Sequence, residues 1–149
     1  MSLSYRLTLA GSVAADQLAE RAFPDLENRP SGTGPILFAD LYATHGFGVA
    51  VRTGRNGHVD AGTDDGDWEW EPDPFAAVSF DIDDVTDRQR LAVNLVTVVR
   101  RILETGPEDA AFVINGDYLL VSRFGGRIVK HSHDRWWSYY PEADELIAG

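Results

Sequence analysis

Carboxylates and tryptophans alternate in one short stretch of this 149-residue sequence, DGDWEWEPDP at residues 65–74. Carboxylates can attract a basic protein surface or coordinate a divalent cation, and tryptophan supplies contact area in protein interfaces. In a β-strand, successive side chains point to opposite faces of the sheet. We therefore expect Trp68 and Trp70 to be buried beneath helices, and Glu69 and Glu71 to face the other way.

The net charge of the chain is concentrated around this stretch. The sequence has 24 acids and 13 bases, a net charge of −11, and residues 60–87 hold eleven of the acids and no lysine or arginine. This distribution disfavours binding to nucleic acid or to an anionic membrane, and it favours a cationic partner, such as a basic protein surface, or a metal ion. An acidic segment of this kind is also typical of a surface that only keeps a protein soluble.

The alternation continues through residues 76–83, where Asp81 and Asp83 point outward if the apolar residues between them point into the core. We expect these carboxylates to share one acidic, helix-free face of the sheet with Glu69 and Glu71. Four aromatic residues within 136–140 either cover an open part of the sheet or form an interface cluster. The residues predicted to bind a partner are Asp64, Asp65, Asp67, Glu69, Glu71, Asp73, Asp81, Asp83, Tyr139 and Tyr140.

Two other classes of function remain open. Asp81 and Asp83 could bind a divalent cation together with His131 or His133, as in a metal-dependent hydrolase. Alternatively, the tryptophans could line the pocket of a small-ligand sensor. The spacing completes no metal-ligand set, however, and the chain has no cysteine and no Gly-x-Ser-x-Gly or Ser-x-x-Lys motif. We therefore predict a protein that is not an enzyme, with no catalytic residue, no metal and no cofactor.

Apolar periodicity and turn residues predict a single α+β domain over residues 1–149. Stretches 27–35 and 60–66 are expected to be loops, and Asn56-Gly57 is typical of a hairpin turn. The order β-α-β-β-β-α-β-β-β predicts a largely antiparallel sheet of six to seven strands with two helices on one face. The expected elements are strand 5–9, helix 13–22, strands 36–44 and 48–53, one bent strand or two over 68–83, a helix from 86 to 103, and strands 110–114, 117–123 and 127–131.

Three finer predictions concern individual elements. Residues 36–44 are apolar on both faces, which is typical of a central strand. Residues 86–89 have the pattern of a capping box, with Thr86 as the first residue and Gln89 as the last. Asn115-Gly116 and Gly125-Gly126 are expected to turn the chain between the last three strands.

Three segments carry a resemblance to a known family: SYRLTLAGS near the start, WEWEP in the middle, and GPEDAAFVINGDYLLV after the long helix. Together they resemble bacterial immunity proteins of the SitI type, third subfamily, which protect cells from polymorphic toxins that related bacteria deliver on contact. The resemblance implies a binding protein that neutralises a cognate toxin. Because no apolar run approaches the roughly 18 residues of a membrane span and the N-terminus does not resemble a signal peptide, we expect a cytoplasmic location.

Overall fold

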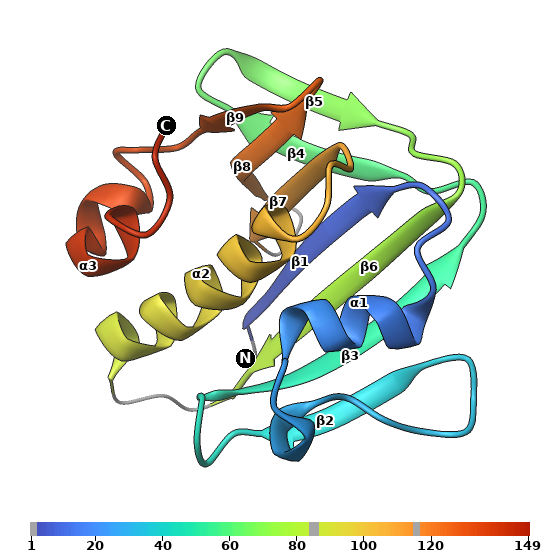
Figure 1. Cartoon of the computed structure of the whole chain (residues 1–149). Coiled ribbons are helices and arrows are strands. Elements are labelled where there is room, and N and C mark those ends of the chain that lie inside the picture. The colour runs from blue at the N-terminus through green and yellow to red at the C-terminus, as the bar shows by residue number, and fades with distance from the viewer. Residues whose placement is uncertain (1–2, 84–86, 115–116) are drawn as a thin grey trace.

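Nine strands form one twisted sheet in the computed structural model, which describes residues 3–83, 87–114 and 117–149 (Figure 1). Their spatial order is β2-β3-β6-β1-β7-β8-β4-β5, with β9 also beside β8. All of these pairs are antiparallel except the short contact between β4 and β8. The strands are β1 (Leu3–Ala10), β2 (Leu37–Leu41), β3 (Phe47–Gly54), β4 (Val59–Thr63), β5 (Gly66–Trp70), β6 (Phe75–Ile82), β7 (Ala110–Ile114), β8 (Tyr118–Phe124) and β9 (Arg127–Lys130).

Two main helices, α1 (Ala15–Ala22) and α2 (Arg88–Glu104), cover one face of the sheet, which we call the helix side (Figure 1). The α+β class and both helices agree with the sequence prediction. Helix α2 begins after Asp87, whose carboxylate accepts a hydrogen bond from the Arg90 backbone N–H at 3.0 Å. The predicted capping residue Thr86 lies outside the described residues. The shorter helices are η1 (Leu26–Asn28), η2 (Trp137–Tyr139) and α3 (Pro141–Asp144).

The larger core lies between the helices and the central strands. Phe80 of β6 and Phe112 of β7 have no exposed side-chain area, and Phe80 meets Phe47 edge to face with ring centroids 5.1 Å apart. The alternation predicted for β6 is confirmed, because Ala77, Ser79 and Asp81 on the other face are smaller or polar. The periodic residues of α2 point into this core: Leu91, Leu95, Val98, Val99, Ile102 and Leu103.

A hairpin made of β4 and β5 packs on the opposite face, which we call the hairpin side. Val59 and Ala61 of β4 are buried there, and their cross-strand partners are Trp70 and Trp68 of β5. The two indole rings contact Phe124 at centroid distances of 5.1 and 6.1 Å. This second core also contains residues of β7 and β8, namely Ala111, Val113 and Leu119.

Strand β5 has the predicted alternation, but its tryptophans pack on the other side of the sheet from the one predicted. Glu69 and Glu71 are exposed as expected, whereas Trp68 and Trp70 are half-buried on the hairpin side and not beneath the helices. The reason is β4, which occupies residues expected to be a loop and brings its own apolar positions against the sheet. This strand, and the division of residues 68–83 into β5 and β6, account for nine strands where six to seven were predicted.

Two strand placements also differ from the prediction. Strand β2 forms an edge of the sheet and not its centre, and Ile36 and Phe38 are 53% and 51% exposed. The turn at Asn56-Gly57 does not join paired neighbours, because β3 pairs with β2 and β6 whereas β4 pairs with β5 and β8. The acidic stretch and residues 75–82 form two separate strands at distant places in the sheet.

The aromatic tail is ordered and closes the helix-side core. Trp136 and Trp137 are buried, and their indole N–H groups donate to the Tyr5 hydroxyl at 3.1 Å and to the Leu120 carbonyl at 3.0 Å. The tail therefore covers the sheet, one of the two roles expected for it. The predicted turn at Gly125-Gly126 is confirmed by φ angles of 61° and 82°, whereas the one at 115–116 lies outside the described residues.

Candidate interaction surfaces

The hairpin carries a dense group of carboxylates on the side that faces away from the sheet. Because Val59 and Ala61 point inward, Asp60 between them points outward, directly opposite Glu69 of β5. None of these groups forms an ion pair with a described lysine or arginine. We call this set the hairpin acidic surface; its members are Asp60, Asp64, Asp65, Asp67, Glu69 and Glu71, all exposed.

Asp73 follows the hairpin but differs from it, because its charge is compensated. Its carboxylate pairs with the Arg55 guanidinium at 2.6 Å and accepts a hydrogen bond from the Asn56 N–H at 2.9 Å. The hydrogen bond from Arg55 is the main cause that lowers the pKa of Asp73. Gly57 lies against this loop: a Cβ atom there would lie 2.5 Å from the Pro72 carbonyl oxygen, so only glycine fits.

Asp81 and Asp83 are exposed as predicted, but they lie far from the hairpin carboxylates in the order of the strands. Four strands, β1, β7, β8 and β4, separate β6 from β5 in the sheet. The Tyr42 hydroxyl donates to the Asp81 carboxylate at 2.8 Å, and this bond is the main cause that raises the pKa of Tyr42 to about 12. The carboxylates that were expected to form one acidic patch therefore form two separate groups.

The histidines proposed as partners of Asp81 lie elsewhere. His131 bonds Ser122 through its Nε2 at 2.9 Å, and burial is the main cause that lowers its pKa, against the opposing effect of Asp64 and Asp65. Asp81 and Asp83 do not form a group of potential metal ligands with His131 or His133 among the described residues. The hydrolase site considered from sequence is therefore not assembled.

A different trio of potential ligands does meet, on the hairpin. Ligand atoms of His58, Asp60 and Glu69 lie within 4.8 Å of one another, and all three residues are exposed. An imidazole and two carboxylates are donors that divalent transition metals accept. Sequence reasoning missed this trio because residues 60–66 were expected to be a loop; pairing them with β5 would have placed Asp60 opposite Glu69.

The aromatic residues are divided between the two cores. Trp136 and Trp137 belong to the helix-side core, whereas Trp68 and Trp70 belong to the hairpin side, so the pocket imagined for a small-ligand sensor is not formed by the two pairs together. Tyr140 packs on Trp136, with ring centroids 4.7 Å apart.

Tyr139 is the exposed member of the tail, with 63% of its area open to solvent. Its backbone carbonyl is fixed by a hydrogen bond from the Gln89 side chain at 2.6 Å. A large side chain on a fixed backbone is the kind of residue that contributes strongly to interfaces.

Comparison with known proteins assigns this architecture to a family. A family model described as SitI3-like matches residues 3–141, which include all nine strands and both main helices. The chain belongs to the SitI3-like family. The matched region contains the hairpin acidic surface, and this confirms the family resemblance seen in the sequence.

No curated protein and no solved structure matches the chain. No helix among the described residues of this SitI3-like protein is long and apolar enough to cross a membrane.

Proposed function

We propose that this SitI3-like protein is an immunity protein that neutralises a cognate toxin in the cytoplasm by binding it, without catalysis. The hairpin acidic surface is the leading contact. One observation carries this choice: six exposed carboxylates lie on one two-stranded element, and none is paired with a described lysine or arginine. A basic surface of the toxin would supply the missing positive charge.

The arrangement suits fast electrostatic capture. Like charges that lie directly opposite in a sheet repel, and at Asp60 and Glu69 this costs about 0.2–1 kcal/mol of stability. Binding to a basic partner would reverse that repulsion. The field of such a group reaches roughly 8 Å at physiological ionic strength, so it would steer the toxin before contact and weaken as salt is added.

The remaining predicted contact residues take secondary places in the proposal. Asp73 is already paired with Arg55, so it would contribute less long-range field than its neighbours. Asp81 and Asp83 form a separate group that would contact the toxin only if the interface extended across the sheet. Tyr139 is the stronger aromatic candidate, because Tyr140 packs against Trp136.

The test uses the purified protein and the product of the toxin gene adjacent to its own gene. We expect a stable complex, protection of cells that express the toxin, and an association rate that falls steeply as salt is added. Tyr139→Ala should mainly raise the dissociation rate, because short-range packing is lost only after docking. Failure of the wild-type protein to bind the toxin or to protect cells would count against immunity itself.

A further inference from the structure

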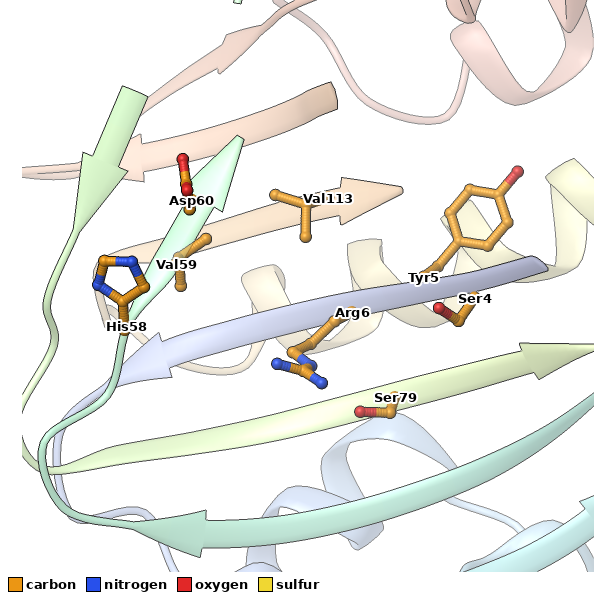
Figure 2. Close-up of a pocket in the computed structure, with 8 residues that line it drawn as sticks. All are labelled: Ser4, Tyr5, Arg6, His58, Val59, Asp60, Ser79 and Val113. Atoms are coloured by element: carbon orange, nitrogen blue, oxygen red, sulfur yellow. The ribbon is translucent and has the colours of Figure 1, made fainter. Parts of the chain in front are cut away.

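A basic groove lies on the hairpin side, between the start of β4 and the strands β1 and β6. Ser4 and Arg6 of β1, Ser79 of β6 and residues 58–60 line a hollow of about 250 Å³ (Figure 2). A second hollow of about 250 Å³ adjoins it, because both are lined by Arg6 and His58; it adds Arg52 and Phe75. Two exposed arginines, Arg6 and Arg52, therefore line one groove of a chain whose net charge is −11.

The register of the sheet places the two arginines on the same side of β6. Arg6 is paired with Ser79, and Arg52 with Ala77, so both point to the hairpin side from the strands flanking β6. Their strands are two spacings apart, roughly 10 Å. The side chains of β6 between them are small, and Figure 2 shows Arg6 reaching toward β6 beside Ser79. A single small ligand above β6 can therefore contact both guanidinium groups.

These charges are not compensated within the described structure. Arg6 has no hydrogen bond or ion pair with a described residue. Burial in the groove, and then the nearby Arg52, lower the pKa of Arg6, although a guanidinium remains protonated at neutral pH. Arg52 lies over the Phe75 ring at 5.6 Å, whereas Arg55 at the groove end already pairs with Asp73.

We propose that this groove binds an oxyanion, a phosphate or carboxylate group, with Arg6 and Arg52 as its charged ligands. The Ser79 hydroxyl, which lines the same hollow, would donate a hydrogen bond to the bound group. Planar guanidinium groups match the oxygens of phosphate and carboxylate, and two of them suit a ligand with two negative charges. The inference does not rest on toxin binding, since Arg6 and Arg52 are not members of the hairpin acidic surface, which borders the groove only at Asp60.

One carboxylate borders the groove and limits how a ligand can lie. Asp60 lines the first hollow, but it forms no ion pair with Arg6. Its negative charge repels an anion at the β4 rim, so the bound group should sit over β6, toward Arg52.

Binding can be measured with inorganic phosphate and, separately, with succinate, at constant ionic strength set by chloride. We expect saturable chemical-shift changes in amides of β1, β3 and β6 with at least one of the two anions. Arg6→Gln and Arg52→Gln should each weaken binding about tenfold or more, the usual loss for a charge-assisted hydrogen bond. Arg127→Gln is the matched control, because Arg127 is exposed on β9, away from the groove.

The two anions also distinguish the sources of the ligand. Saturable binding of phosphate alone would support a phosphorylated small molecule, and binding of succinate alone would support acidic side chains or a dicarboxylate. If either arginine variant lost its fold by circular dichroism, Ser79→Ala would replace it, with a smaller expected loss of affinity. Shifts that do not saturate with either anion, or that weaken equally in Arg127→Gln, would overturn the proposal.

Discussion

The two sides of the sheet bury apolar residues to very different degrees. On the helix side, Phe80 and Phe112 are completely buried under two helices and an aromatic tail. On the hairpin side, a five-residue cluster is covered by two half-buried tryptophans. The hairpin meets β8 through one parallel pair, Gly62 with Tyr118. We infer that the helix side supplies most of the stability, and that the hairpin side can carry dense charge because its outer face has no packing role.

The largest expected effect is on the helix side. Phe112→Ala should lower the free energy of unfolding by about 3–5 kcal/mol, because it leaves a cavity among fully buried rings. Chemical denaturation followed by tryptophan fluorescence measures this loss. A change below about 1 kcal/mol would mean that the helix-side core is not the main source of stability.

The next largest loss of stability is expected on breaking an ion pair near the end of α2, which is mostly shielded from water. Arg21 donates to both oxygens of Glu108 at 2.8 and 2.9 Å, and this bonding is the main cause that lowers the pKa of Glu108. Arg123 is held nearby by bonds to three backbone carbonyls. Glu108→Gln should cost about 1.5–3 kcal/mol at neutral pH, as for a hydrogen bond to a charged group.

The pH dependence of that loss identifies its cause. A lowered carboxylate pKa contributes stability that is complete above the unfolded value of 4.5 and is lost as the pH falls through the folded value. The difference in the free energy of unfolding between wild type and Glu108→Gln should therefore be constant above about pH 5.5 and become smaller below about pH 4.5. A difference that stays constant down to pH 3 would show that the Glu108 charge is not involved.

A smaller effect is expected on the hairpin side. Trp70→Ala should cost about 2 kcal/mol, because part of the indole surface stays open to solvent on the hairpin side. In hydrogen exchange, the amides of β4 and β5 should lose protection while those of β1 and β7 keep theirs. Equal loss of protection in all four strands would mean that the two sides of the sheet unfold as one unit.

The smallest effect has the opposite sign. Glu69→Lys should raise the free energy of unfolding by about 0.2–1 kcal/mol, because it replaces a like-charge pair with Asp60 by an attractive one. Thermal unfolding at low salt is the measurement. A native charge that lowers stability suggests that the residue is retained for binding. If Glu69→Lys instead lowered the free energy of unfolding, this support for a binding role of Glu69 would be lost.

The sequence predicted the helix side well because its signals are strong and local. The apolar stripe of α2 and the alternation of β6 each determine an element and its buried face. The hairpin side was predicted poorly, because β4 has only Val59 and Ala61 to mark it as a strand.

The same limit explains the partial success at the candidate surfaces. Alternation correctly predicted that Glu69 and Asp81 are exposed, since it depends only on neighbours within one strand. It could not predict that four strands separate β5 from β6, because strand order depends on contacts far apart in sequence. The basic groove was missed for this reason too: Arg6 and Arg52 meet only through their shared neighbour β6.

The most direct test of the toxin-binding account compares three variants with the same change in charge. Asp67→Lys/Glu69→Lys alters the hairpin, Asp81→Lys/Asp83→Lys alters the second acidic group, and Asp25→Lys/Glu27→Lys alters exposed residues around η1. The measurement is the association rate with the cognate toxin at low salt. We predict a fall of about tenfold or more for the hairpin variant and much smaller changes for the other two. Equal rates in all three folded variants would contradict the claim that the hairpin acidic surface captures the toxin.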